Sequence, residues 1–401
     1  AITDEPGMTT LSTPLTLRCG TTLPNRLAKA AMSERLAPLS GPAMGVPTKQ
    51  LVQLYQTWAE SGAGLLITGN VMVDPAAIGE SGNVVARGDQ LDAFRRWAAV
   101  AKSGGAEVWL QINHPGRQVP RLLSSEPVAP SAIGLQGMGG AFATPRALAD
   151  AEIKRIIERF AEATSLAKSA GFTGVQIHAA HGYLINQFLS PLSNQRVDDW
   201  GGSASNRRRF LLEVVQAVRA EAGDDFAVSV KLNSADFQRG GFSEEESMGA
   251  LELLDSEGVD LIEVSGGTYE SAAMFDVARR GSSTQKREAF FLDYAEKARA
   301  RCSTPLMLTG GFRTGDGMRR ALDSGAVDVI GMARPMALEP DLPGRLLSKP
   351  GTAAQVVDLA TGIRKLDGMI QGGWYQQQLV RMSEGKRPDP ALARWRAAWR
   401  Y

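Results

Sequence analysis

The sequence predicts an α/β protein, a (β/α)8 TIM barrel with long βα loops and a C-terminal helical extension. Short apolar runs alternate with longer stretches of helical period along the 401 residues. This alternation is typical of βαβ units in a parallel sheet. Eight such units favour a closed barrel over an open, doubly wound sheet. No early G-x-G-x-x-G motif follows a predicted strand, which argues against a dinucleotide-binding open sheet.

The predicted strands are short apolar runs, and helix-period stretches follow them. The strands are Leu27–Ala31, Gly64–Thr68, Glu107–Ile112, Gly174–His178, Ala227–Leu232, Leu261–Ser265, Leu306–Thr309 and Val327–Gly331. The helices are Thr48–Ser61, Leu91–Ser103, Asp150–Ala170, Ser205–Ala222, Ser243–Glu257, Phe290–Arg301, Thr314–Ser324 and Leu342–Leu347. Ser243 precedes Glu244–Glu246 as a helix N-cap with first-turn acids. Gly171, Gly258 and Gly325 lie where a helix should end before a strand.

Three connections are too long to be simple links. They are Pro115–Ala149, Ala179–Ala204 and Gly266–Ala289, and each follows the C-terminal end of a predicted strand. Barrel enzymes build their active sites at that end. Because Pro115–Ala149 is rich in Gly, Pro and Ser, we expect it to form a lid or a covering hairpin.

Composition excludes several classes of function. With 44 Lys and Arg against 43 Asp and Glu, the net charge is +1, which gives no electrostatic case for a nucleic acid or an anionic membrane as partner. No apolar run reaches about 18 residues, so no membrane span is predicted. Cys19 and Cys302 form no C-x-x-C pair, which argues against structural zinc, an iron–sulfur cluster and a disulfide scaffold. The residues before Met8 lack signal-peptide features, so the expected location is the cytoplasm.

The three histidines, His114, His178 and His181, all follow the predicted ends of strands three and four. His178 and His181 could donate hydrogen bonds to a carbonyl or nitro oxygen on which negative charge develops. Tyr183 is a phenol that could deliver a proton. His114 is explained equally well as a structural side chain. A zinc-dependent barrel hydrolase is the alternative, although no Asp or Glu ends strand three or four as a further ligand.

Two further groups of residues suggest a bound cofactor. Gln111 and Asn113 end strand three, and their amides could pair with a pyrimidine-like edge. Lys231, in strand five, needs an anionic partner if buried. That partner is either a carboxylate on a neighbouring strand or a reduced, anionic flavin.

The loops after strands seven and eight predict a phosphate site, as is usual in these barrels. Gly310 and Gly311 let backbone N–H groups approach an anion, and Arg334 supplies a forked positive charge. This pattern indicates a phosphate-bearing ligand without identifying it.

The ordered motifs resemble those of the old yellow enzyme family of NAD(P)H:flavin oxidoreductases, including the barrel of 2,4-dienoyl-CoA reductases. The most specific match is His178–Asn194, H-A-A-H-G-Y-L-I-N-Q-F-L-S-P-L-S-N, which continues through Arg196, Asp198 and Trp200–Ser203 to Asn206–Arg208. Leu23–Arg26, Gln111–Arg117 and the two phosphate loops support it. The similarity spans about residues 11–350.

The resemblance implies an enzyme with bound FMN that NADH or NADPH reduces, followed by reduction of an activated C=C bond in a ping-pong cycle. His178 and His181 would anchor the substrate oxygen, and Tyr183 would protonate the α-carbon. The expected cofactor-binding residues are Ala31, Met32, Asn70, Gln111, Lys231, Gly310, Gly311, Ala333 and Arg334. Residues 8–350 would form the FMN-binding barrel. Residues 351–401 would form a helical extension that packs on the barrel or on a neighbouring subunit through Trp374, Tyr375, Trp395 and Trp399.

The sequence departs from the family pattern at several positions. Ser33 stands where some members have Cys or Thr, Lys231 where Arg is usual, and no Tyr lies near Glu34–Arg35. Gly69 and Asn70 replace a more usual acidic-small pair. The absence of a cysteine cluster predicts a stand-alone barrel. An N-demethylase of the same family and a non-enzymatic ligand-binding barrel remain alternatives. We expect a small-molecule substrate, no metal and a homo-oligomer, dimer or tetramer.

Overall fold

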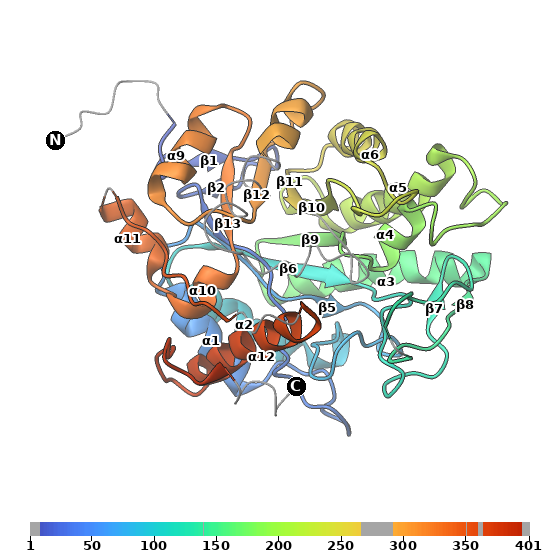
Figure 1. Cartoon of the computed structure of the whole chain (residues 1–401), viewed down its shortest axis with the longest axis horizontal. Coiled ribbons are helices and arrows are strands. Elements are labelled where there is room, and N and C mark those ends of the chain that lie inside the picture. Colours follow the sequence, from blue (N-terminus) through green and yellow to red (C-terminus); the bar gives the residue numbers. More distant parts are fainter. Residues whose placement is uncertain (1–8, 139, 266–291, 350, 360–363, 395–401) are drawn as a thin grey trace.

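The protein is a closed barrel of parallel strands surrounded by helices (Figure 1). The structure, a computed structural model, describes residues 9–138, 140–265, 292–349, 351–359 and 364–394. The barrel strands are β3 (Leu27–Lys29), β4 (Leu65–Ile67), β6 (Glu107–Asn113), β9 (Gly174–Ala179), β10 (Ala227–Asn233), β11 (Leu261–Ser265), β12 (Leu306–Thr309) and β13 (Val329–Met332). The pairing of β4 with β6 closes the ring. The predicted (β/α)8 barrel is confirmed, with strand ends shifted by one or two residues.

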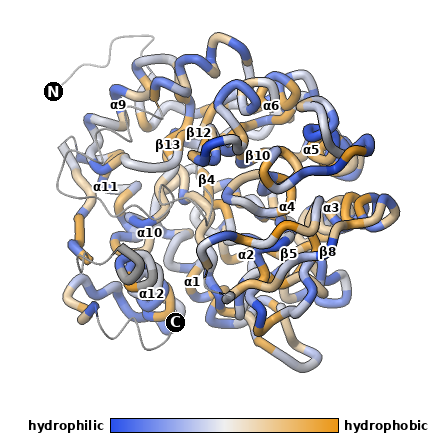
Figure 2. The backbone as a smooth tube through the Cα atoms, turned by 45° about the vertical axis from the view of Figure 1, so that its right-hand side comes forward, coloured by the Kyte–Doolittle hydropathy of each residue, from blue (hydrophilic) through white to orange (hydrophobic). Residues whose placement is uncertain are grey.

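The outer helices carry hydrophobic and hydrophilic stretches, visible on α3 and α5 in Figure 2, as expected where one face packs on a barrel. The helices are α1 (Lys49–Ala59), α2 (Leu91–Lys102), α3 (Asp150–Ala170), α5 (Ala204–Ala222), α6 (Glu244–Ser256), α9 (Gly315–Asp323) and α11 (Leu342–Ser348), with a further helical stretch over residues 292–299. The start of the predicted helix Phe290–Arg301 lies outside the described residues. None of the described helices is long and apolar enough to cross a membrane.

Predicted helix ends are confirmed by their hydrogen bonds and backbone angles. The Ser243 hydroxyl accepts the Glu246 N–H at 3.3 Å, and the Glu246 carboxylate accepts the Ser243 N–H at 3.0 Å, which is a capping box. Gly171, Gly258 and Gly325 have φ of 86°, 68° and 71°. Glycine adopts this left-handed conformation without the steric penalty that a Cβ brings.

Alternate residues of each strand point into the barrel, and they form three layers. The layer nearest the N-terminal ends is apolar: Ala28, Leu65, Trp109, Ala227, Leu261, Met307 and Val329. Further along, β3 and β4 contribute Ala30 and Ile67, whereas the inward positions of β6, β9, β10 and β11 form a polar layer: Gln111, Gln176, Ser229, Lys231 and Glu263. The layer at the C-terminal ends is also polar: Asn113, His178, Asn233, Ser265 and Thr309. Polarity therefore rises toward the C-terminal mouth, where the candidate residues lie.

A short antiparallel pair that the sequence did not predict covers the N-terminal end of the barrel. It consists of β1 (Leu15–Thr16) and β2 (Thr22–Leu23). Leu17 and Leu23 are buried in the same cluster as the apolar interior layer. The other small elements are β5 (Val71–Met72), the 3-10 helix η1 (Gly88–Gln90), α4 (Leu184–Leu189) and α10 (Arg334–Leu338).

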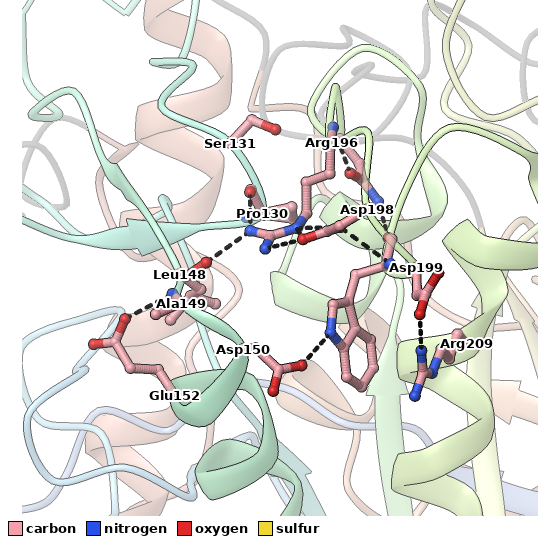
Figure 3. A network of polar contacts seen from close by, with 12 residues as sticks. Pro130, Ser131, Leu148, Ala149, Asp150, Glu152, Arg196, Asp198, Asp199 and Arg209 are labelled. Carbon is pink, nitrogen blue, oxygen red and sulfur yellow. Dashed lines mark hydrogen bonds and ion pairs between the residues drawn. The ribbon is translucent and has the colours of Figure 1, made fainter.

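The long segment Pro115–Ala149 contains β7 (Val128–Ala129) and β8 (Arg146–Ala147). These strands pair in parallel, and the antiparallel pairing expected of a hairpin occurs in this segment at the isolated bridge between Pro120 and Phe142. Arg196 ties this segment to the loop after β9: its guanidinium donates to the carbonyls of Pro130 at 2.9 Å and Leu148 at 2.7 Å and pairs with Asp198 (Figure 3). Two long βα loops are thereby fixed to one another.

The C-terminal segment contributes α12 (Arg364–Ser383), which lies against α1 and α10 (Figure 1). Trp374 is fully buried with Leu338 and Leu359. Trp395 and Trp399 lie outside the described residues. The division into a barrel domain and an extension stays a prediction.

Candidate active site

His178, His181 and Tyr183 gather at the C-terminal mouth of the barrel. His178 lies in β9, and the other two follow in the turn before α4. The ring centroid of His178 is 5.2 Å from that of His181 and 4.8 Å from that of Tyr183, with both pairs edge-to-face. The structure therefore brings together the three residues that the sequence predicted for catalysis.

The backbone at His181 is left-handed, with φ of 60°, and Gly182 follows with φ of 76°. Side chains from three segments hold this turn. The His181 N–H donates to the Asn233 amide oxygen at 3.2 Å, and the His181 carbonyl accepts from the Gln118 amide at 3.0 Å. The Gly182 N–H donates to the Asn186 amide oxygen at 2.7 Å. Strained backbone of this kind persists where its surroundings over-determine it, and it clusters at functional sites.

A backbone hydrogen bond assigns the tautomer of His178, and a serine hydroxyl contacts the ring of His181. Nδ1 of His178 accepts the N–H of Ala180 at 3.3 Å, so the proton of the neutral ring is on Nε2. Nε2 of His181 lies 2.7 Å from the Ser265 hydroxyl. If Ser265 donates this bond, Nδ1 of His181 carries the proton. Each ring can then offer one N–H to an oxygen.

Both imidazoles are held neutral. Burial lowers the pKa of His178 well below its usual value, and the charge of Lys231 and the repulsion that a protonated His181 would exert lower it further. Burial and the charge of Lys231 likewise lower the pKa of His181. Neutral rings can donate hydrogen bonds without adding charge to the pocket.

Asn70 lies beside Tyr183. Its amide donates to the Tyr183 hydroxyl oxygen at 3.4 Å, and its own oxygen accepts from Asn83 at 3.5 Å. Asn83 also contacts the Ser33 hydroxyl, which donates to Glu80. An amide donor at the phenol oxygen would support the negative charge left there after Tyr183 gives up a proton.

His114 does not join this group. Its Nδ1 accepts the Gly116 N–H at 3.0 Å, and its Nε2 lies 3.8 Å from a carboxylate oxygen of Asp74, which is paired with Arg159. His114 follows the strand at the next position after the inward-facing Asn113, so it faces the outer shell. The structural interpretation of His114 is supported.

The polar layer links Gln111 to Lys231 through two residues that the sequence analysis missed. The Gln111 amide donates to the Gln176 oxygen at 2.8 Å, and the Gln176 amide donates to Glu263 at 2.8 Å. The second carboxylate oxygen of Glu263 accepts from Nζ of Lys231 at 2.8 Å. Lys231 therefore forms an ion pair with a carboxylate on a neighbouring strand, which is one of the two partners predicted for it.

The predicted phosphate residues follow β12 and β13, which pair at Thr309 and Gly331. Gly310 and Gly311 have φ of 128° and 83°, angles that side chains rarely adopt. Arg334 is the first residue of α10 and donates to Gln371 of α12 at 3.2 Å. The backbone of these two loops and one guanidinium thus lie beside one another at the barrel mouth.

Ala31 and Met32 follow β3 at the same mouth. Ala31, together with Ala333 beyond β13, packs partly buried on the interior cluster. Both positions carry the small side chain of alanine.

Unsatisfied polar atoms mark the same region. Both side-chain polar atoms of Asn113 and the hydroxyl of Thr309 are buried with no hydrogen-bond partner within the described part of the chain. Buried polar atoms ordinarily have partners, so these three atoms fit a polar ligand bound at the mouth. Groups of three or more His, Cys, Asp or Glu that could hold a metal are not found among the described residues.

Ser265, Asn233, Gln118, Gln176 and Glu263 all belong to the site or its support, and none was predicted. Period-two alternation offered a signal for one of them. Gln176 lies two residues before the predicted His178, so the two side chains face the same side of the strand.

Comparison with known proteins yields one consistent family. A sequence model of the "NADH:flavin oxidoreductase / NADH oxidase family" matches residues 10–350. The chain is similar to NADH-dependent flavin oxidoreductase iliE of Hypocrea jecorina, with 42% identity over 83% of this chain and 87% of the relative. Among solved structures, the old yellow enzyme homologue from Zymomonas mobilis superposes with a TM-score of 0.71 and 27% identity, covering 86% of this chain and 94% of the other. Morphinone reductase in complex with tetrahydroNAD gives 0.69 and 29%, over 86% and 92%.

Proposed function

Since this chain belongs to the NADH:flavin oxidoreductase / NADH oxidase family, the old yellow enzyme family, and is an oxidoreductase with FMN as cofactor and NAD(P)H as reductant, we propose that it reduces activated C=C bonds. The substrates of this reaction are α,β-unsaturated carbonyl or nitro compounds. The observation that carries the proposal is the grouping of two neutral imidazoles and a phenol at one barrel mouth. Membership in this family favours the flavin interpretation over the metal-dependent hydrolase.

The residues at the mouth fit FMN. Gln111 and Lys231 would meet the pyrimidine part of the ring, and Ala31, Met32 and Asn70 would lie beside the ring system. The phosphate would be held by the residues of the two loops after β12 and β13, Gly310, Gly311, Ala333 and Arg334. When bound, FMN supplies the two-electron chemistry that joins oxidation of the nicotinamide to reduction of the alkene.

His178 and His181 would hold the substrate oxygen. Reduction of an activated alkene moves negative charge onto that oxygen, and two preorganised N–H donors stabilise it there. Because both rings are neutral before substrate binds, their hydrogen bonds strengthen as the charge grows. Removing one such donor costs about 10²–10³ in rate in other enzymes.

Tyr183 would protonate the α-carbon. Its ring lies against His178, so a substrate held by the imidazoles has its C=C bond near the phenol. Asn70 would stabilise the resulting phenolate through the 3.4 Å contact to the hydroxyl oxygen. Tyr183→Phe should therefore lower alkene reduction and leave oxygen anchoring intact.

The nicotinamide and the alkene would occupy the same place in turn, which makes the cycle ping-pong. The predicted catalytic residues gather at one barrel mouth, and the predicted cofactor-binding residues would hold the flavin beside them. The similar morphinone reductase has been solved in complex with tetrahydroNAD, which supports direct binding of a nicotinamide in a barrel of this shape.

The experiment compares the wild type with the double variant His178→Ala, His181→Ala in steady-state assays with NADH or NADPH and a panel of activated alkenes. We expect turnover of cyclohexenone or a nitroalkene by the wild type and a loss on the order of 100-fold or more in the variant. His114→Gln, outside the site, is the matched control and should keep most activity. Full alkene turnover by the double variant would refute the oxygen-anchoring role.

A further inference from the structure

Glu263 lies at the centre of the polar layer inside the barrel. One carboxylate oxygen accepts from Nζ of Lys231 at 2.8 Å, and the other accepts from the Gln176 amide at 2.8 Å. The oxygen of Gln176 accepts from the Gln111 amide at 2.8 Å. Three short hydrogen bonds thus connect Glu263 to the two side chains expected to meet the flavin ring.

The strands themselves place these residues together. Lys231 and Glu263 are paired positions of β10 and β11, and Gln111 and Gln176 are paired positions of β6 and β9. Glu263 and Gln176 have no exposed surface. A buried carboxylate without hydrogen-bond partners would be costly. Both oxygens of Glu263 have such partners, so its burial in the polar layer is stabilised.

Glu263 also determines the orientation of two amides. A carboxylate only accepts hydrogen bonds, so the NH₂ group of Gln176 must face it. The oxygen of Gln176 then faces Gln111, whose NH₂ group must donate to it. In this series of hydrogen bonds, Gln111 uses one N–H to bind Gln176. Its side-chain carbonyl oxygen and second N–H remain for another partner.

We propose that Glu263 is a positioning residue that lowers the reduction potential of the flavin. It offsets the positive charge of Lys231, which alone would favour the anionic reduced ring. Through Gln176 it also fixes which end of the Gln111 amide faces the cofactor. The inference rests on the proposed flavin site and adds a residue that would not touch the flavin itself.

The test measures the midpoint potential of bound FMN and the dissociation constant of sulfite, which adds to oxidised flavin and leaves an anionic ring. In Glu263→Gln, the charge of Lys231 is no longer offset. We expect sulfite to bind about tenfold tighter or more and the potential to rise. A tenfold change in the equilibrium constant of a two-electron reduction corresponds to about 30 mV. An unchanged potential and sulfite affinity would overturn the proposal.

A double-variant cycle isolates the ion pair. Lys231→Met should lower the potential, and Lys231→Met with Glu263→Gln should return it toward the wild-type value. If Glu263→Gln alone does not fold, the double variant must still have a higher potential than Lys231→Met. Equal potentials in those two proteins would contradict the proposal.

Asp260→Asn is the matched control. Asp260 lies just before β11, is buried, and is paired with Arg219, but its side chain also bonds the backbone N–H groups of Cys19 and Val228 near the N-terminal end of the barrel. Its loss should reduce stability without changing the potential or sulfite binding. If Asp260→Asn changed the midpoint potential as much as Glu263→Gln does, the effect would not be specific to Glu263.

The amide part is tested by Gln176→Leu. Without Gln176, the Gln111 amide is free to rotate, and we expect the dissociation constant of FMN to rise about threefold to tenfold. Wild-type affinity in this variant would contradict the orientation of Gln111 by Glu263.

Two further variants separate this inference from the proposed function. If Gln111→Ala and Lys231→Met change neither FMN affinity nor potential, the flavin does not bind at the proposed place. If both change them but Glu263→Gln behaves as the wild type, the flavin site stands and only the role of Glu263 is wrong.

Discussion

His181 combines an imidazole that we propose binds the substrate with an unfavourable backbone conformation. A left-handed φ costs roughly 1–2 kcal/mol for a residue with a Cβ, and three side-chain hydrogen bonds at His181 and Gly182 offset this cost. The side chain of His181 thereby turns toward His178 and Ser265. The position of this ring depends on residues from three other segments.

Ser265 should control the proton position on His181. In Ser265→Ala, Nε2 loses its 2.7 Å partner, and the ring is free to adopt the other tautomer. We expect phenol binding, followed by the change in flavin absorbance, to weaken about threefold to tenfold. Ser256→Ala, which removes an exposed hydroxyl, is the control. Unchanged phenol binding in Ser265→Ala would show that the hydroxyl does not set the tautomer.

The two neutral histidines predict a dependence of stability on pH. Their folded pKa values lie well below the unfolded value of about 6.5, so below this pH the unfolded chain binds more protons. The free energy of unfolding must therefore fall as the pH is lowered through about 6.5 toward the folded pKa values, and it is regained above 6.5.

Urea unfolding of the FMN-bound protein at pH 7 and pH 5.5 measures this effect. The decrease should be smaller in the double variant His178→Ala, His181→Ala by about 1 kcal/mol for each histidine. An equal decrease in both proteins would show that these rings are not held neutral by the fold.

How far the site was predictable depends on distance along the chain. His178, His181 and Tyr183 follow one strand end within six residues, so a local motif brings them together. Ser265 lies 84 positions from His181, and it reaches His181 only because the barrel closes. The charge of Lys231 was predicted, but its partner Glu263 looked like an ordinary strand residue until the register of β10 and β11 was known.

At the scale of elements, Arg196 joins two of the long loops that follow strands of the barrel. Its side chain is 12% exposed and bonds two backbone carbonyls of the Pro115–Ala149 segment as well as Asp198 (Figure 3). The Trp200 indole donates to Asp150 at the start of α3 at 2.8 Å. The residues that follow the histidines along the chain thus join the two loops to the start of α3.

Arg196→Ala should destabilise the protein by about 1–3 kcal/mol, because it leaves buried carbonyls without partners. Thermal or urea unfolding measures the loss. Arg155→Ala, whose side chain is 51% exposed and pairs with surface glutamates, should change stability by less than about 1 kcal/mol. Equal effects of the two substitutions would contradict the bridging role of Arg196.

The barrel strands and outer helices were predictable because each has enough residues to show its period. The pair β1–β2 was not, since each strand has two residues and no alternation can be read from so few. The parallel pairing of β7 and β8 was also missed, because a Gly-rich segment gives no indication of strand direction. The pairs β1–β2 and β7–β8 depend on tertiary contacts rather than on a local sequence pattern.

At the scale of the whole molecule, α12 connects the C-terminal segment to the barrel. Trp374 is buried against Leu338 of α10, and Arg334 of the predicted phosphate site donates to Gln371. The Gln376 amide donates to the carbonyl of Glu34 beyond β3. Helix α12 therefore supports two of the loops at the barrel mouth.

Trp374→Ala should destabilise the protein by about 3–5 kcal/mol through the cavity it leaves, and it should weaken FMN binding because α12 supports Arg334. Leu122→Ala is the control, since Leu122 is 99% exposed, and it should be neutral. The measurements are urea unfolding and FMN titration. Unaltered stability of Trp374→Ala would mean that α12 is not held by this packing.

The central claim is that two neutral imidazoles hold the substrate oxygen while a flavin below them transfers electrons. Anaerobic mixing of NADH-reduced enzyme with cyclohexenone, followed by flavin absorbance, tests it most directly. We predict rapid reoxidation in the wild type, reoxidation slower by on the order of 100-fold in His178→Ala, His181→Ala, and similar rates of flavin reduction by NADH in both. Reoxidation of the variant at the wild-type rate would contradict the account.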